Sequence, residues 1–355
     1  MDKKNKICFA VSGFSNNGVT RVLSILLDNI DTKKYDISVL LTKPSQIEMN
    51  ISKAISVEQI TYDNKIKIIN KIKSLIKIRK FFKRKKFDKV IVLGNYASMY
   101  VLISTLGIKI KKIISERNDP NREPSRKIYR ILRNIIYKTA DIIVCQTTDS
   151  ANYYKNIVKE TRIIMNPIKD NLPYASKKKS NYIVNFCRID SQKNLKLLID
   201  SFNDFCIDFP EYFLKIYGNG PLELEIKKYI NQTKMKNNIE LNDFCSDIHE
   251  KIKDASMFVS TSDFEGMSNS MLEAMAMGIP TICTDCPIGG AHTVINNNVN
   301  GILVECNNKN ELVNAMKKVA SDNVFSELIS KESIKIRQSL DKNKICEKWW
   351  NLIDE

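Results

Sequence analysis

The chain has 355 residues, which is too long for one ordinary core, so we expect two domains of about 150 to 180 residues each. Hydrophobic residues make up 43% of the sequence and charged residues 27%, which argues against an intrinsically disordered chain and against a membrane-embedded one. The formal net charge of +16 implies an anionic partner from one of three classes: nucleic acids, anionic membrane surfaces or phosphorylated substrates.

The first part of the chain alternates short apolar runs with amphipathic segments, a pattern typical of parallel strands joined by crossover helices. The run from Ile7 to Val11 is too short for a signal peptide, so we expect a cytoplasmic protein. Residues 90–108 carry no charge, but Gly94 interrupts them, which favours a strand and a buried helix over a membrane span. The strands expected in the first domain are residues 7–12, 37–42, 90–93, 113–115 and 142–145.

The stretch from Lys65 to Lys89 combines many positive charges with apolar residues at helical spacing. Such a composition suits a helix that lies on an anionic membrane surface. The alternative is a helix that packs on the core of the first domain and leaves a solvated lysine face, and the residues themselves favour neither. The apolar members of this stretch are Ile68, Ile69, Ile72, Leu75, Ile76, Phe81 and Phe82.

A second series of expected strands follows a linker. Pro167 and the polar residues 176–180 suit such a linker, so we place the domain boundary near Lys169. This predicts an N-terminal domain (residues 1–168), a C-terminal domain (residues 169–340), and a terminal helix (residues 341–355) that packs back on the first domain. The strands expected in the second domain are residues 182–187, 213–217, 239–241, 257–260 and 281–283.

The most informative segment is residues 262–280. It begins after the expected strand 257–260 and continues into a helical pattern, so Glu265 to Ser268 lies at the carboxyl end of a parallel strand, where α/β sheets bind ligands. The backbone N–H groups around Ser268, Asn269 and Ser270, at the start of the helix, form an anion site.

Glu265 and Glu273 are separated by seven residues, and they resemble the Glu-x7-Glu motif of the retaining glycosyltransferases of family 4. The resemblance implies that Glu265 contacts the transferred sugar and that Glu273 binds the ribose hydroxyls of a nucleotide-sugar donor. The alternative is that Ser270 and Glu273 form a helix capping box. The other donor-binding residues expected in this segment are Gly266, Met267, Ser268, Asn269 and Ser270.

Residues 185–194 lie between an expected strand and a helix, and they are similar to the donor-phosphate motif of the same family. Arg188 and Lys193 would then hold the diphosphate, whose negative charge grows as the glycosidic bond breaks. The alternative is that both side chains are solvated surface charges.

Three glycine-containing loops also resemble loops of the family. Gly218 and Gly220 belong to a Gly-x-Gly-Pro turn, for which a simple tight turn is an equal alternative. Gly18 lies in a glycine loop after the first strand, and Gly289 and Gly290 lie in the loop expected to line the donor sugar. The chain departs from the family at Thr293, where an acidic residue is frequent, and at residues 116–118, where many members have a histidine.

We expect no metal ion and no cofactor. The sequence has no Asp-x-Asp, and its two histidines, His249 and His292, are expected to be structural. Its nine cysteines look like reduced core thiols, so we interpret Cys283 and Cys286 as an accidental Cys-x-x-Cys rather than half of a zinc site.

The resemblance implies an α/β protein of the GT-B fold, with two Rossmann-like domains that face each other across a donor-binding cleft. It further implies retaining transfer from a nucleotide-diphosphate sugar, expected to be a UDP-sugar, to a glycan acceptor. A lipid-linked acceptor in surface polysaccharide synthesis would place the enzyme at the inner face of the plasma membrane. Two alternatives remain open, namely a nucleotide-sugar 2-epimerase and a basic nucleic-acid-binding protein, although we expect no nucleic-acid partner.

Overall fold

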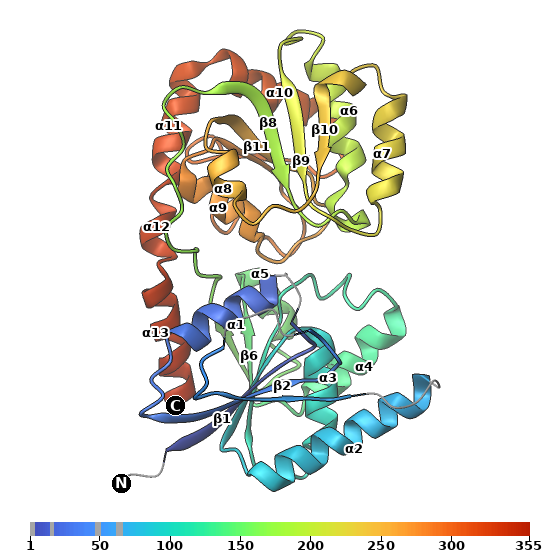
Figure 1. Ribbon diagram of the computed structural model, residues 1–355, viewed down its shortest axis with the longest axis vertical. Coiled ribbons are helices and arrows are strands. Elements are labelled where there is room, and N and C mark those ends of the chain that lie inside the picture. Colours follow the sequence, from blue (N-terminus) through green and yellow to red (C-terminus); the bar gives the residue numbers. More distant parts are fainter. Residues whose placement is uncertain (1–3, 15–17, 47–50, 62–66) are drawn as a thin grey trace. The chain divides into compact units, whose positions relative to one another are not determined.

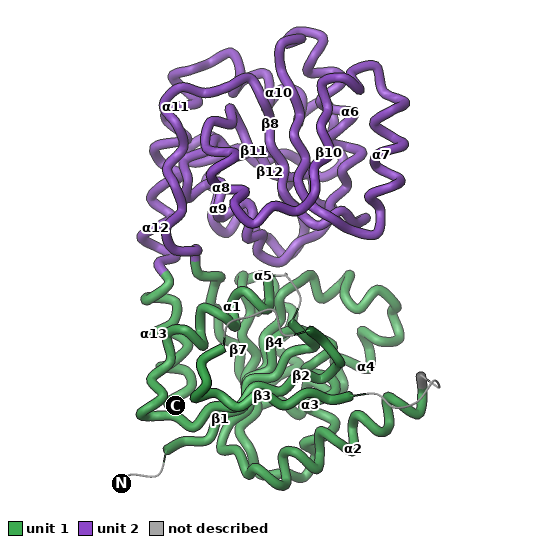
Figure 2. The backbone as a smooth tube through the Cα atoms, viewed as in Figure 1, with its two compact units in different colours: residues 1–167, 342–355 green, residues 168–341 purple. Residues whose placement is uncertain are grey.

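The computed structural model describes residues 4–14, 18–46, 51–61 and 67–355. The chain divides into two compact units, Met1–Pro167 with Lys342–Glu355, and Ile168–Asp341 (Figure 2). Each unit has its own parallel sheet with helices on both faces (Figure 1). Lys65, the first residue of the predicted basic stretch, lies outside the described residues.

In the described part of the first unit the sheet has seven strands, in the order β3-β2-β1-β4-β5-β6-β7, all parallel. Ile7, in the interior of the sheet, pairs with Ile37 on one side and Lys89 on the other. The strands are β1 (Asn5–Val11), β2 (Tyr35–Leu41), β3 (Ser56–Gln59), β4 (Lys89–Leu93), β5 (Lys111–Ser115), β6 (Ile142–Cys145) and β7 (Glu160–Ile163). The helices are α1 (Gly18–Asp28), α2 (Lys67–Lys85), α3 (Asn95–Ser104), α4 (Lys127–Tyr137), α5 (Thr148–Tyr154) and α13 (Lys342–Asp354).

The terminal helix α13 packs on this first sheet. The ring of Trp350 stacks on Tyr35 at a centroid distance of 5.9 Å and meets Phe9 edge-on at 6.4 Å. Trp349 is fully buried, and the hydroxyl of Tyr35 donates to Asp354. The aromatic residues at the end of the chain therefore form part of the core of the first unit.

In the second unit six parallel strands take the order β10-β9-β8-β11-β12-β13. The strands are β8 (Ser180–Phe186), β9 (Phe213–Tyr217), β10 (Ile239–Asn242), β11 (Ala255–Ser260), β12 (Thr281–Thr284) and β13 (Ile302–Val304). The helices are α6 (Leu195–Phe205), α7 (Glu223–Gln232), α8 (Ile248–Lys251), α9 (Asn269–Met277), α10 (Lys309–Ser321), α11 (Asn323–Ser333) and α12 (Ile336–Ser339), with short 3-10 turns η1 (Ser191–Lys193) and η2 (Lys236–Asn238).

The predicted α/β class is confirmed, and each predicted strand exists with ends that differ from the prediction by at most two residues. Three edge strands, β3, β7 and β13, were not predicted. β3 and β7 are only partly buried, with no continuous apolar run, and β13 is three residues long. Strands of this kind carry too weak a pattern to be recognised.

No helix in the described part of the chain is long and apolar enough to cross a membrane.

Candidate functional site

Four loops meet at the carboxyl edge of the second sheet, after β9, β8, β11 and β12. From β8 the chain winds outward through β9 to β10, and from β11 it winds the other way through β12 to β13. The order therefore reverses between β8 and β11, and in doubly wound sheets ligands bind at this switch point. The loops after β8 and β11 carry the residues singled out from the sequence, Arg188, Lys193 and Glu265.

Lys193 and Glu265 form an ion pair across the switch point. Their side chains are only 14% and 18% exposed, and Ser262 Oγ donates to the same carboxylate at 3.3 Å. Burial by itself would lower the pKa of Lys193, but the nearby Glu265 carboxylate outweighs it, so the pKa is raised and the lysine is charged at neutral pH. The structure thus brings together two residues from separate sequence motifs.

The two loops are joined by further hydrogen bonds. Gln192 Nε2 donates to the Phe264 carbonyl at 2.8 Å and to Glu265 Oε1 at 3.2 Å. Asn194, in a left-handed conformation with φ of 43°, caps α6 through its side chain and donates to Asp263 at 2.7 Å. Gln192, Asn194 and Asp263 were not predicted as site residues, although all three lie inside the segments that resemble family motifs.

Arg188 is held differently, because its side chain is 71% exposed and its Nε lies 3.4 Å from Asp190 Oδ2. Asp190 in turn accepts from the backbone N–H of Gln192 at 3.1 Å and thereby starts the η1 turn. A guanidinium at the end of β8 is therefore loosely oriented and open to an anion.

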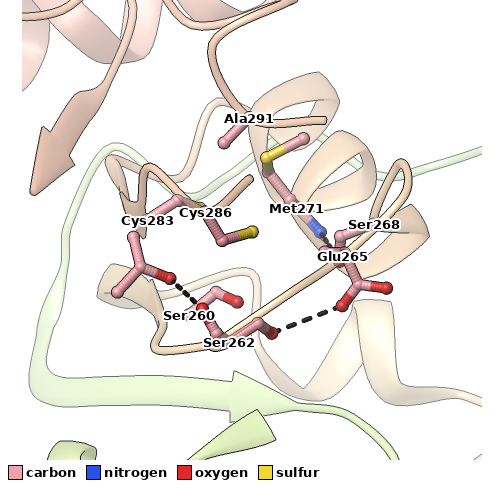
Figure 3. A pocket seen from close by; sticks show the side chains of 9 residues that line it. Ser260, Ser262, Glu265, Ser268, Met271, Cys283, Cys286 and Ala291 are labelled. Carbon is pink, nitrogen blue, oxygen red and sulfur yellow. Dashed lines mark hydrogen bonds between the residues drawn. The ribbon is translucent and has the colours of Figure 1, made fainter. Parts of the chain in front are cut away.

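A cavity of about 10 Å³ lies beside Glu265 and has room for about one water molecule (Figure 3). The Thr284 hydroxyl donates to the Ser262 carbonyl at 2.6 Å and so ties the end of β12 to the β11 loop. A hexose does not fit in this cavity, so a sugar that contacts Glu265 has to lie outside it. The cavity is lined by Ser260, Ser262, Glu265, Ser268, Met271, Cys283, Thr284, Cys286 and Ala291.

Helix α9 begins beside this cavity, and its N-cap is Ser268, whose hydroxyl accepts from the Met271 N–H at 3.4 Å. The alternative of a capping box between Ser270 and Glu273 is therefore wrong, because Ser270 is already inside the helix. The N-terminal end of α9, with Asn269 and Ser270, adds partial positive charge to this edge of the sheet. Met267, just before the cap, is 5% exposed and packs inward.

Glu273 points from α9 to His249 on α8, and the distance from its Oε2 to His249 Nε2 is 2.8 Å. The carboxylate is 4% exposed and the histidine 9%, and the Phe186 ring meets the imidazole edge-on. A buried carboxylate with a fixed partner has a defined direction. From the sequence we expected Glu273 to contact the donor, but its pairing with His249 was not predicted.

The glycines of the site have packing reasons for their identity. A Cβ at Gly218 would lie 1.8 Å from the Cys187 carbonyl oxygen, and one at Gly220 would lie 2.1 Å from that of Ile189. This turn therefore packs directly on the loop that carries Arg188. A Cβ at Gly290 would lie 1.6 Å from the Gly266 carbonyl oxygen, so the β12 loop packs directly on the β11 loop. Gly289 has a φ of 67°, which favours glycine.

Gly18 belongs to the other unit, where it is the first residue of α1 and is exposed. In the same unit Glu116 follows β5 and is buried, with Tyr154 donating to it at 2.9 Å. Burial raises the pKa of this carboxyl, and the Arg133 guanidinium partly opposes the shift.

All nine cysteines are free thiols, and burial raises the pKa of both Cys283 and Cys286, to about 12 for the latter. Among the described residues no cluster of three or more histidine, cysteine and acidic side chains could hold a metal ion. His292 lies 2.7 Å from Asp285 and His249 pairs with Glu273, so both histidines have protein partners.

Comparison with known proteins agrees with this architecture. Residues 169–342 match the family model of the glycosyl transferases group 1. An uncharacterised glycosyltransferase of Methanocaldococcus jannaschii is 29% identical over 50% of this chain and 49% of its own length. The GalNAc-alpha-(1->4)-GalNAc-alpha-(1->3)-diNAcBac-PP-undecaprenol alpha-1,4-N-acetyl-D-galactosaminyltransferase of Campylobacter jejuni is 24% identical over 99% of this chain and 98% of its own length.

The solved structure of Anabaena HepE in complex with UDP and glucose has the same fold, with a TM-score of 0.85 at 16% identity over 98% of this chain and 99% of that one. The predicted fold class, with two Rossmann-like domains of the GT-B type, is confirmed by this likeness.

Proposed function

Because the chain is a group 1 glycosyltransferase, we propose that it transfers a hexose, with retention of anomeric configuration, from a UDP-sugar to a lipid-linked glycan in surface polysaccharide synthesis. HepE binds UDP and glucose, which supports the donor class. The Campylobacter relative is named for an acceptor on undecaprenol diphosphate, which supports the acceptor class. The chain spans about half of the first of these relatives and nearly all of the second.

The observation that carries the proposal is the charge at the switch point of the second sheet. Lys193 is mostly buried and held by Glu265, Arg188 is exposed in the same loop, and α9 directs its N-terminus to the same edge. Two cations and a helix dipole suit a diphosphate that gains charge as it leaves. A divalent ion is not required for that role, so we propose transfer without a metal.

In this proposal the bond between the anomeric carbon and the diphosphate oxygen breaks while the acceptor hydroxyl attacks from the same face. The proton of the acceptor passes to the departing phosphate oxygen, so no side chain acts as nucleophile. Glu265 orients the sugar through its hydroxyl groups, and Lys193 and Arg188 stabilise the leaving diphosphate. Gly266, Met267 and Ser268 shape the loop that carries Glu265.

Glu273 takes the ribose hydroxyls in this scheme, and His249 keeps its carboxylate in place. A carboxylate can accept two hydrogen bonds from a pair of neighbouring hydroxyls, as in many nucleotide sites. With one oxygen directed to His249 at 2.8 Å, the carboxylate has a fixed orientation before donor binds.

The basic stretch contributes the proposed contact with an anionic membrane. The first half of α2 exposes Ile68, Ile72 and Ile76, whereas Phe81 and Phe82 are buried in the core. The second half of the helix therefore packs on the core, and we propose that the exposed first half contacts the membrane. Its lysines and arginines would attract an anionic bilayer, each by about 1 kcal/mol.

A donor panel tests the function. Each nucleotide sugar is scored by release of nucleotide and by thermal stabilisation, since a ligand far above its Kd stabilises the protein by a few kcal/mol. We expect a UDP-sugar to give both signals. Incubation with donor alone tests the 2-epimerase alternative, because an epimerase would convert the nucleotide sugar without an acceptor. A gel-shift assay at physiological salt tests the nucleic-acid alternative.

A further inference from the structure

Helix α4 has its polar and apolar sides reversed. Ile128, Ile131, Leu132 and Ile135 follow the i, i+3, i+4, i+7 spacing of one helix face, and they are 57%, 48%, 41% and 56% exposed. A surface helix normally turns such a face to the core. Here the side that faces the core instead carries Arg133, which is fully buried.

The buried arginine explains this orientation. Its guanidinium donates to the Glu123 carbonyl at 2.5 Å and to the Tyr153 hydroxyl at 3.0 Å. It also lies 5.4 to 5.9 Å from the ring centroids of Tyr137, Tyr153 and Tyr154. Rolling the helix to bury its isoleucines would take the cation away from all these partners. The contacts of Arg133 therefore fix the orientation of α4 and keep its apolar stripe exposed.

The surroundings of the stripe are basic. Arg122, Arg126, Lys127 and Lys138 are exposed next to it or at its ends, and Glu123 is the only acidic residue between 120 and 140. Helix α3 packs against both α4 and α2, and α2 exposes Ile68, Ile72 and Ile76 among its lysines (Figure 1). The two helices that pack on α3 thus both combine exposed isoleucines with positive charge.

We propose that α4 is an insertion helix, whose stripe of Ile128, Ile131, Leu132 and Ile135 enters the acyl boundary of an anionic bilayer. The inference rests on the membrane contact in the proposed function and names the element that supplies its apolar part. An exposed apolar face with cations at its edges suits anionic lipid. A second copy of the chain would instead bring two surfaces of the same charge together, on molecules of net charge +16.

The test uses the full chain and vesicles of phosphatidylglycerol and phosphatidylcholine. We expect Ile131→Ser/Ile135→Ser to lower the fraction that sediments with vesicles, with an apparent partition constant reduced about tenfold or more. The matched control is Val324→Ser/Leu328→Ser in α11, which has the same spacing and exposures of 81% and 51% in the second unit. We expect this control to partition like the unmodified protein.

Depth is measured with Ile131→Trp. The fluorescence of the added tryptophan is obtained by subtracting the signal of Trp349 and Trp350 in the unmodified protein. It should shift to the blue on vesicle binding and be quenched by lipids brominated in the acyl chain. Replacing Lys83, Arg84, Lys85 and Lys86 by glutamine should weaken salt-dependent recruitment but leave the quenching of the bound fraction unchanged.

The proposal would be overturned if Ile131→Ser/Ile135→Ser bound vesicles as well as the unmodified protein does, or if the control variant lost as much vesicle binding. It would also be overturned if the brominated lipids did not quench the tryptophan at position 131. A dimer that becomes monomeric in the α4 variant by sedimentation velocity would overturn it too, since a second copy would then cover the stripe. Donor turnover with a water-soluble acceptor separates membrane insertion from the transferase function. This turnover should be normal in the α4 variant. Vesicle binding without any turnover in the unmodified protein would reject the transferase and leave the insertion helix standing.

Discussion

Lys193 and Glu265, 72 residues apart, form an ion pair that joins the ends of β8 and β11. Both side chains are mostly buried, so each charge depends on the other for compensation. Loss of one partner should therefore affect stability as well as chemistry, whereas loss of an exposed cation nearby should affect chemistry alone.

We predict that Lys193→Met lowers the free energy of unfolding by about 3 kcal/mol, because it leaves the Glu265 carboxylate buried without its cation. Lys193→Met/Glu265→Gln should recover part of that loss, since no uncompensated charge remains. Denaturant unfolding measures both. Transfer should fall by about two decades or more in each variant, and activity that returned together with stability would contradict the assigned role of Lys193.

The same pair predicts a pH dependence. The pKa of Lys193 is raised above its ordinary value of 10.5, so its contribution to stability is fully present below that pH and is lost as the pH rises through the raised pKa. The difference in unfolding free energy between the unmodified protein and Lys193→Met should thus be constant through the neutral range and shrink only in strongly alkaline solution. A difference that disappears near neutral pH would contradict this.

Arg188→Ala should keep its stability within about 0.5 kcal/mol, because an exposed side chain with one long ion-pair contact contributes little to folding. Its transfer rate should nevertheless fall by about two decades, since the leaving diphosphate loses a cation. Lys227→Ala, an exposed cation on α7, is the control and should retain full activity. Steady-state kinetics of both variants measure the transfer rate, and thermal melts measure their stability.

His249→Ala should weaken donor binding by roughly tenfold, with KM raised more than kcat is lowered, because Glu273 loses the group that orients it. His249→Gln should recover most of the affinity, since the glutamine amide nitrogen can take the place of Nε2. UDP titration by calorimetry separates this from a stability effect. Equal affinities in all three proteins would mean that the contact is only structural.

Gly290→Ala should lower stability by about 1 to 3 kcal/mol and abolish most transfer, since the added methyl would lie 1.6 Å from the Gly266 carbonyl oxygen and push the Glu265 loop away. Gly301→Ala is the control, because its nearest atom would be at 3.1 Å. A variant of Gly290 with the melting temperature and turnover of the control would show that the two loops are not coupled.

Exhaustive chelation should leave transfer intact, since Arg188, Lys193 and the start of α9 supply positive charge for the diphosphate. Turnover is measured after dialysis against EDTA and again with added magnesium or manganese. Activity that depends wholly on the added ion would contradict metal-independent transfer.

The sequence by itself determined the class of the fold and the kinds of residue at its strand ends. Apolar runs in alternation with amphipathic segments suffice for the central strands of both sheets, because these strands are buried on both faces. The edge strands β3 and β7 were not predicted, since their partly solvated faces need no continuous apolar run. Glu265, Glu273, Arg188 and Lys193 could likewise be chosen from the sequence, because they lie in segments that resemble motifs of the family-4 glycosyltransferases.

Only the tertiary structure decided which of these residues meet. The pairing of Lys193 with Glu265 requires β8 and β11 to be neighbours, and the pairing of Glu273 with His249 requires α8 to lie against α9. The reversed burial of α4 also depends on partners far along the chain, because Arg133 is held by Tyr153 and Tyr154. Local periodicity specifies that a helix has an apolar face, but the balance between burying that face and satisfying a buried cation is set by contacts that only the folded chain makes.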